Sequence, residues 1–141
     1  MTEYMDFAQN HPLLFVGLAL VIFFIIKIEV ARFTRKYHQI NTNEAVQLLN
    51  RDDTVVVDVR EDNEVSAGII NGAKHIPLAS LSKQLSQLSK FKQTPILIYC
   101  RSGNRSGTAC QKLSQEGFSD VYNLAGGIMS WESANLPISK R

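Results

Sequence analysis

A lone cysteine stands where an apolar run meets a polar, glycine-containing loop, in the stretch YCRSGNRSGTAC at residues 99–110. The preceding TPILI at 94–98 is typical of a buried strand, and the sequence predicts a helix that opens at Ser106. A loop that runs from a strand into a helix turns successive backbone N–H groups inward and can bind an anion. The candidate site is therefore the loop Cys100, Arg101, Ser102, Gly103, Asn104 and Arg105, with Ser106 at the start of the helix.

This environment favours a nucleophilic thiolate. The following helix N-terminus and the guanidinium groups of Arg101 and Arg105 are expected to lower the pKa of the Cys100 thiol, and the thiolate is the reactive form. No histidine adjoins Cys100 in sequence, so His38 or His75 would reach it only through folding. Such a loop suits reactions that place negative charge on or beside the sulfur. Phosphoryl transfer to cysteine and transfer of sulfane sulfur both meet this condition.

The composition narrows the class of protein. The 141 residues are enough for one globular domain, and a net charge of +2 from scattered residues gives no reason to expect nucleic-acid binding. The two cysteines, Cys100 and Cys110, provide neither a disulfide framework nor a zinc motif, so we expect no metal site and no cofactor. Free thiols are typical of a reducing compartment. Cys110 falls within a predicted helix and is interpreted as a buried structural thiol.

An apolar run, LLFVGLALVIFFII, occupies positions 13–26 and extends to Ala31 if two charged residues near its end are accepted. At about 1.5 Å per residue, a helix over 13–31 reaches roughly 28 Å, close to the hydrocarbon thickness of a bilayer. A signal peptide would need basic residues before the run, where Glu3 and Asp6 stand instead. A buried core helix is the other alternative. We interpret the run as an uncleaved anchor.

The basic residues follow the run, at Lys27, Arg32, Arg35 and Lys36, and the positive-inside rule then puts the C-terminal side in the cytoplasm. We expect a protein of the inner (cytoplasmic) membrane with a short extracytoplasmic N-terminus at 1–12, a transmembrane helix at 13–31 and a basic linker at 32–39. The soluble domain would occupy 40–139 and be held close to membrane lipid.

Helix and strand patterns alternate in this soluble part. Asn41 is a plausible N-cap, with Glu44 three residues later. Strand patterns occur at 54–59, 94–99 and 120–124, and helix patterns at 41–50, 80–88, 106–117 and 127–134. Short apolar strands between helices indicate an α/β fold with a parallel sheet covered on both faces. Ligands of such sheets bind beyond the carboxyl ends of the strands, which is where Cys100 is expected to lie.

Asp58 and Arg60, in the stretch DVRE, lie at the end of the strand pattern 54–59 and toward the same edge. We interpret Asp58 as a hydrogen-bonding brace for a neighbouring loop. Arg60 is either an anion-binding group or a surface ion-pair partner. His75 and Trp131 are interpreted as structural residues, and AGG at 125–127 as a strand-to-helix turn whose backbone could line the pocket.

Three separated motifs carry a resemblance to a known family. VVVDVREDNEVSAGIINGAKHIPL, ILIYCRSGNRS and GFSDVYNLAGGIMSW resemble, in order, the motifs of the rhodanese family of sulfurtransferases, over roughly residues 40–139. The resemblance implies a three-layer α/β fold with five parallel strands and a catalytic cysteine, which by position is Cys100. It further implies that this cysteine takes sulfur from a donor such as thiosulfate, becomes a persulfide, and passes the sulfur to cyanide, a thiol or a partner protein.

Cysteine-dependent phosphatases have a similar loop, but they keep a histidine before the cysteine and an arginine six positions after it. Here Tyr99 precedes Cys100 and Ser106 occupies the sixth position, which favours sulfur transfer. Within the rhodanese pattern, Ile69 stands where a histidine is usual and Val65 where an aromatic residue is common. Two alternatives remain: a membrane-tethered sulfur-relay or binding module with little thiosulfate activity, and a small phosphatase or arsenate reductase.

Overall fold

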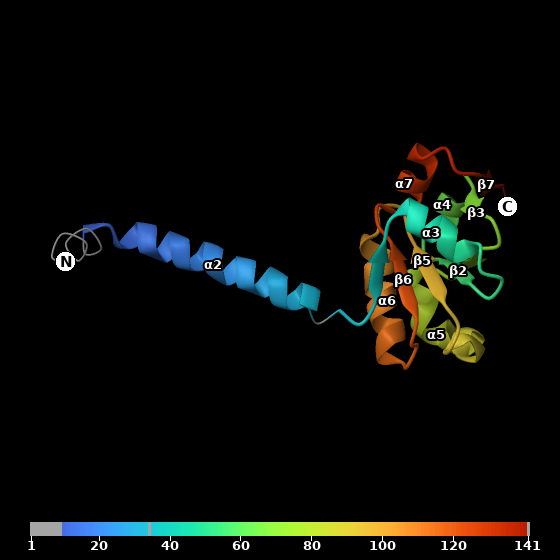
Figure 1. Cartoon of the computed structure of the whole chain (residues 1–141), viewed down its shortest axis with the longest axis horizontal. Coiled ribbons are helices and arrows are strands. Elements are labelled where there is room, and N and C mark those ends of the chain that lie inside the picture. The colour runs from blue at the N-terminus through green and yellow to red at the C-terminus, as the bar shows by residue number, and fades with distance from the viewer. Residues whose placement is uncertain (1–9, 34, 141) are drawn as a thin grey trace. The chain divides into compact units, whose positions relative to one another are not determined.

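The computed structural model describes residues 10–33 and 35–140, so the first nine residues of the expected segment 1–12 lie outside the described range. The chain divides after Arg35 into two compact units, each of which is described by itself. Within the described residues the first unit contains one long helix, and the second contains the sheet and its helices (Figure 1). Cys100 belongs to the second unit.

Helix α2 spans Pro12–Phe33 and holds the apolar run. Its segment Pro12–Val30 has a mean hydropathy of 2.7, and none of its residues is buried. The core helix of a soluble protein would be mostly buried. By length and composition α2 is a candidate membrane span, and a signal sequence would have the same character. The helix runs two residues past its predicted end at Ala31. The next strand, β1 (His38–Ile40), begins inside the predicted linker 32–39.

A five-stranded parallel sheet forms the centre of the second unit, as predicted from the family resemblance. Its strand order is β1-β6-β5-β2-β4. The strands other than β1 are β2 (Val55–Asp58), β4 (Lys74–His75), β5 (Ile96–Tyr99) and β6 (Val121–Leu124). In the register of the two central strands Asp58 lies opposite Tyr99, so their carboxyl ends meet at one edge of the sheet.

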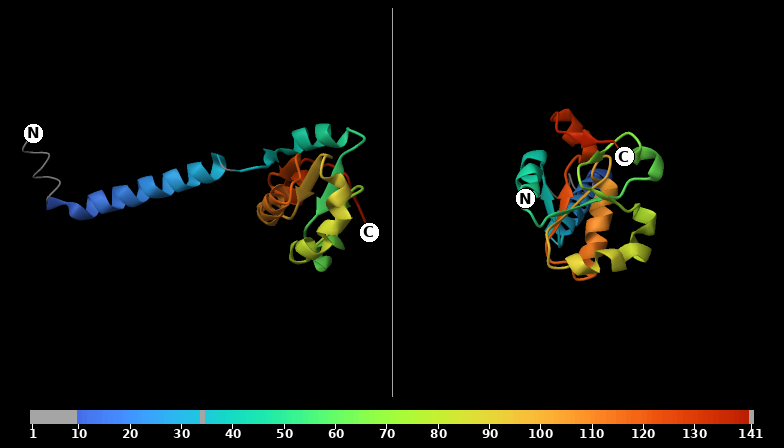
Figure 2. Two further views of the ribbon diagram at one scale, coloured as in Figure 1. Left: turned by 90° about the horizontal axis from the view of Figure 1, so that it is seen from below. Right: turned by 90° about the vertical axis from the view of Figure 1, so that its right-hand side faces the viewer.

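Helices cover both faces of this sheet (Figure 2). One face carries α5 (Leu78–Leu88), continued by the 3-10 turn η1 (Ser89–Phe91), and α6 (Asn104–Gln115). The other carries α3 (Thr42–Leu49) and α7 (Gly127–Ser133). Asn41 caps α3 by the predicted capping box: the Asn41 side chain accepts from the Glu44 N–H at 3.0 Å, and Glu44 accepts from the Asn41 N–H at 2.7 Å.

Alternation along β5 decides which face each of its side chains enters. Ile96 and Ile98 pack into the core beneath α5 and α6, whereas Leu97 and Tyr99 pack into the core beneath α3 and α7. The next residue, Cys100, continues the alternation and belongs to the α5/α6 core. The period of two therefore places the sulfur beneath the N-terminal end of α6.

Smaller elements join β2 to β4 and close the domain. They are the one-turn helix α4 (Asp62–Val65) and strand β3 (Ile69–Ile70), which pairs antiparallel with β7 (Ile138–Ser139). These elements, together with β1 and β4, were not among the elements predicted from the sequence pattern. The four strands have only two or three residues and α4 is a single turn, so none of them shows a hydrophobic period. Ile69, the departure from the family pattern, pairs with Ser139 in this small sheet.

Candidate active site

Cys100 follows directly on β5, and its residue is only 1% exposed. Its sulfur nevertheless has polar partners, since the Gly103 N–H donates to Cys100 Sγ at 3.1 Å and the Ser106 hydroxyl donates at 3.4 Å. The loop therefore directs donors at the sulfur, which an inert thiol in an apolar core would lack.

Two opposing effects act on the Cys100 thiol. Burial raises its pKa, but hydrogen bonds from the Ser106 hydroxyl and from the backbone N–H groups of Ser106, Gly103 and Ser102 outweigh burial. The pKa of Cys100 is consequently below its ordinary value. The site can present a thiolate, and the same donors can hold negative charge that develops on a second sulfur bonded to it.

Helix α6 begins at Asn104, two residues before the predicted start at Ser106. Gly103 is its N-cap and adopts φ 99°, a left-handed conformation that glycine tolerates without strain. A side chain there would also lie 3.2 Å from both the Gly126 nitrogen and the Leu124 oxygen. The early start places Asn104, Arg105 and Ser106 together in the first turn, where their N–H groups face the loop.

The outer side of the loop is held by α7. The Ile128 N–H donates to the Cys100 carbonyl at 2.9 Å, and the Met129 N–H donates to the Arg101 carbonyl at 3.2 Å. Gly127, at φ 58°, lies so close that a side chain there would overlap the Cys100 carbonyl oxygen. The turn at 125–127 was expected as a possible lining of the pocket. It leads into the start of α7, whose N–H groups bind the carbonyls of Cys100 and Arg101. The N–H groups of the loop are therefore left to face inward.

A second support lies beneath the loop. Asn123, on β6, is 1% exposed, and its Nδ2 donates to the Gly103 carbonyl at 3.1 Å. Neither this residue nor the α7 amides could be predicted from the sequence, because 20 or more positions separate them from their partners in the loop.

Arg105 was expected to belong to an anion-binding loop and to favour the Cys100 thiolate. In the structure its guanidinium forms a two-point ion pair with Glu64 of α4, with both N···O distances 2.7 Å. These hydrogen bonds lower the pKa of Glu64 to about 2 and raise the pKa of Arg105. Arg101, the other loop arginine, is exposed. Glu64 was missed although it lies in a quoted motif, since no sequence rule pairs positions 41 apart.

Asp58 and Arg60 reach the same edge of the sheet but form a buried pair. Arg60 Nη2 lies 2.7 Å from Asp58 Oδ2, and Arg60 donates to the carbonyls of Gly68 and Glu64 at 2.7 and 3.2 Å. Because Arg60 is only 4% exposed, it is neither the surface ion-pair partner nor the free anion-binding group considered from the sequence. The pair braces the segment that follows β2, in which Glu64 lies.

His75 completes this brace. Its Nε2 lies 2.8 Å from the Arg60 carbonyl, and its Nδ1 lies 3.5 Å from Asp62 Oδ1. With a side chain 7% exposed, His75 serves as a structural residue, as predicted. These contacts join the His75 ring to the Arg60 carbonyl and to Asp62.

Cys110 is fully buried in the middle of α6, as predicted. Burial is the main cause that raises the pKa of its thiol, and the charge of Cys100 raises it further. The Cys110 thiol also donates to the Tyr122 carbonyl at 3.5 Å. Both cysteines are free. The pKa of Cys100 is thus lowered and that of Cys110 is raised, so of the two thiols only Cys100 has surroundings that favour a thiolate.

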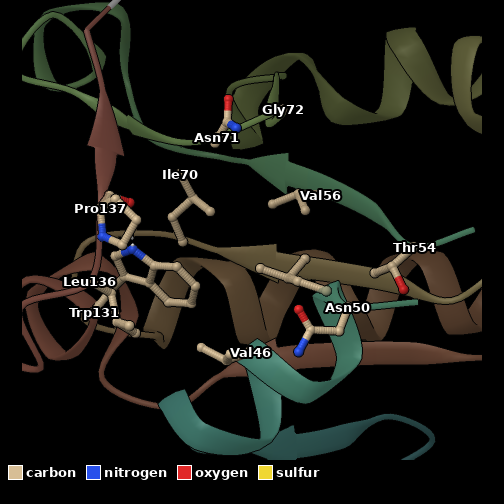
Figure 3. Close-up of a pocket in the computed structure, with 11 residues that line it drawn as sticks. Val46, Asn50, Thr54, Val56, Ile70, Asn71, Gly72, Trp131, Leu136 and Pro137 are labelled. Carbon is tan, nitrogen blue, oxygen red and sulfur yellow. Dashed lines mark hydrogen bonds between the residues drawn. The ribbon is translucent and has the colours of Figure 1, made fainter. Parts of the chain in front are cut away.

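A cavity of about 440 Å³ lies on the α3/α7 face, away from the loop (Figure 3). Figure 3 shows Trp131 and Val46 facing this space from α7 and α3. Its lining comprises Val46, Leu49, Asn50, Thr54, Val56, Ile70, Asn71, Gly72, Trp131, Leu136 and Pro137. Val56, Ile70 and Trp131 belong to the core beneath α3 and α7, whereas Cys100 belongs to the core beneath α5 and α6, so the cavity and the Cys100 sulfur lie on opposite faces of the sheet.

Comparisons with known proteins agree with this geometry. The sequence profile of the Rhodanese-like domain matches residues 41–134. A "Sulfurtransferase" of Allochromatium vinosum is 38% identical over 92 residues, covering 65% of this chain and 84% of that protein. The uncharacterized protein YibN of Escherichia coli K12 is 29% identical over 139 residues, covering 98% of this chain and 97% of that protein.

A solved structure shows the same arrangement of elements. The polysulfide-sulfur transferase homodimer of Wolinella succinogenes superimposes with a TM-score of 0.68 at 25% identity, and the match covers 83% of this chain and 88% of that chain. The profile spans more than half of the sequence, and its residues include the whole cysteine loop. The chain therefore belongs to the rhodanese-like domain family.

Proposed function

We propose that this rhodanese-like protein transfers sulfane sulfur from thiosulfate or a similar donor to a thiophilic acceptor through a persulfide on Cys100. The family and its sulfurtransferase relatives support sulfur transfer in general. The observation that carries the finer proposal is the pair of donors on the sulfur, the Gly103 N–H and the Ser106 hydroxyl.

In the first half-reaction the Cys100 thiolate attacks the outer sulfur of thiosulfate. A sulfur–sulfur bond forms to Cys100, the bond to the sulfonate sulfur breaks, and its electron pair leaves with sulfite. The new terminal sulfur carries negative charge, which the N–H groups that pointed at the thiolate can stabilise. The acceptor then attacks this terminal sulfur: cyanide leaves as thiocyanate, or a thiolate becomes a persulfide, and the electron pair of the broken bond returns to Cys100.

A sulfur-relay module is the second candidate, and two observations favour it. The Wolinella succinogenes relative is named for polysulfide rather than for thiosulfate. Helix α2 is long and apolar enough to tether this chain to a membrane. In this reading a partner supplies the persulfide, and Cys100 only receives and passes on the sulfur.

We also propose that α2 is an uncleaved anchor in the inner membrane, with the Cys100 domain in the cytoplasm. Two observations support this: no part of the apolar segment Pro12–Val30 is buried, and basic residues follow it. The free state of Cys100 and Cys110 fits a reducing compartment.

A thiosulfate:cyanide assay with intact-mass analysis tests the function. The wild-type protein should form thiocyanate, and incubation with donor alone should add the mass of one sulfur atom. Cys100→Ser should lose both properties. Cys110→Ser should keep them, because the Gly103 and Ser106 donors contact Cys100 Sγ, whereas the Cys110 thiol donates to the Tyr122 carbonyl. Wild-type turnover no greater than that of Cys100→Ser, together with no sulfur adduct from thiosulfate or a persulfide donor, would refute the proposal.

A further inference from the structure

Arg105 is positioned to act on an anion at Cys100. It lies in the first turn of α6, beside Ser106, whose hydroxyl contacts Sγ, and the charge of Cys100 acts on the guanidinium. The side chain is 34% exposed, so a ligand can approach it from solvent. An unpaired guanidinium here would add a strong binding contact for an oxyanion such as the sulfonate of thiosulfate.

Glu64 already occupies this guanidinium. Its two carboxylate oxygens accept from Nη1 and Nη2 of Arg105, both at 2.7 Å, which is the two-point geometry that an incoming sulfonate would need. The Glu64 side chain is only 21% exposed. A dianion that enters the site must therefore displace the carboxylate or bind beside its negative charge.

Glu64 is also fixed in place. The Glu61 N–H donates to Glu64 Oε2 at 3.0 Å, and Arg60 Nη1 donates to the Glu64 carbonyl at 3.2 Å. Arg60 is in turn bound to the buried Asp58. These contacts orient the carboxylate before any ligand arrives, so displacing it from Arg105 also disturbs the capping of α4.

We infer that Glu64 determines the donor class of the site by engaging Arg105, disfavouring small dianionic donors such as thiosulfate relative to persulfides carried on a thiol. This inference rests on the proposed sulfur transfer. A thiol persulfide brings at most one negative charge at its reacting end. The Cys100 thiolate attacks its terminal sulfur, a bond to Cys100 forms, and the carrier leaves as a thiolate, so charge and atoms balance without an oxidant.

Donor selectivity is measured as the ratio of kcat/KM for thiosulfate to kcat/KM for glutathione persulfide in the full-length protein. Glu64→Gln should raise kcat/KM for thiosulfate about fivefold, mainly through a lower KM, because a bidentate, partly exposed ion pair is worth about 1 kcal/mol. The value for glutathione persulfide should change by less than about twofold. Glu116→Gln, which removes the same charge from an exposed position at the far end of α6, is the matched control and should leave both values unchanged.

A purely structural role for Glu64 predicts a different result. Loss of the α4 cap alone would lower both kcat/KM values in parallel, and that outcome, or an unchanged ratio, overturns the inference. The gain should also disappear when Glu64→Gln is combined with Arg105→Gln, since the liberated guanidinium is its cause. Persistence of the gain in the double variant would assign it to general charge removal and equally overturn the inference.

A second measurement is independent of turnover and so separates this inference from the proposed function. Iodoacetate and iodoacetamide alkylate the same thiolate but differ in charge, so the ratio of their rates at Cys100, located by peptide mass mapping, reports on the entrance to the site. Glu64→Gln should raise the iodoacetate-to-iodoacetamide ratio about fivefold, with no change in Glu116→Gln. If no variant transfers sulfur, the proposed function fails while this ratio still decides the inference, and equal ratios in wild type and Glu64→Gln contradict it.

Discussion

Replacing Ser106 with alanine should slow the reaction of Cys100 with a neutral electrophile about tenfold at pH values below the wild-type midpoint of the reaction. Ser106 is fully buried, and its hydroxyl donates to Cys100 Sγ at 3.4 Å. A hydrogen bond to a charged group contributes about 1.5–3 kcal/mol, and the long distance here places this one at or just below the lower end. About 1.4 kcal/mol corresponds to a factor of ten.

The direction follows from which form of the thiol the hydroxyl stabilises. The Ser106 hydroxyl favours the thiolate, so its removal raises the pKa of Cys100, while the opposing effect of burial remains. The backbone N–H groups of Gly103 and Ser106 are kept in the variant, so the thiolate is weakened rather than abolished. Reactivity should therefore shift toward higher pH and reach the wild-type plateau once the thiol is fully ionised.

The assay is the second-order rate of iodoacetamide alkylation as a function of pH, read at Cys100 by mass mapping. Thr108→Ala is the control, because it removes an exposed hydroxyl from the same helix and should leave the profile unchanged. The reasoning is refuted if Ser106→Ala and wild type share one pH midpoint. A lower plateau at an unchanged midpoint would also count against it, since that pattern reports restricted access to the sulfur.

Two further predictions concern the frame around the loop. Gly127→Ala should lower the free energy of unfolding in urea by more than about 2 kcal/mol, because its side chain would overlap the Cys100 carbonyl. Gly72→Ala, also at positive φ (77°) but with no atom within 4 Å, should cost only about 1 kcal/mol, and equal losses would contradict the packing argument. The ion pair with Arg105 lowers the pKa of Glu64 from 4.5 to about 2, so its stabilisation is complete above about pH 4.5 and is lost as the pH falls toward 2. Solvent screening keeps the stabilisation by this ion pair near 1 kcal/mol at neutral pH. The difference in urea midpoint between wild type and Glu64→Gln should therefore vanish at low pH. A difference that stays constant with pH would show that the ion pair is not the source of the stability difference.

Local patterns in the sequence were sufficient to predict the central elements. The β-branched run at 54–59 became β2, the TPILIY stretch became β5, and Asn41 with Glu44 formed the predicted capping box. Each of these depends on residues within a few positions of one another. The contiguous loop from Cys100 onward was predicted for the same reason, although α6 begins at Asn104 rather than Ser106.

The residues that support the loop could not be predicted in this way. Asn123 and the start of α7 reach the loop from 20 to 28 positions further along the chain, and Glu64 reaches Arg105 across 41 positions. Arg60 was expected at the surface or on an anion, yet it is buried because Asp58 and two backbone carbonyls satisfy it. Only the parallel sheet, which gathers the ends of β2, β5 and β6 at one edge, brings these groups together.

The sequence by itself was enough to predict the α/β scaffold and to propose Cys100 Sγ as the nucleophile, because a cysteine at the end of a buried strand, followed by a glycine-containing loop and a helix, is a local pattern. Tertiary structure decided the charge around that atom. It directed the Gly103 N–H and the Ser106 hydroxyl at the sulfur and engaged Arg105 with Glu64, so that one predicted cation is already paired. Electrostatic interactions depend on distance in space, and distance in space is set by the packing of the whole sheet rather than by spacing along the chain.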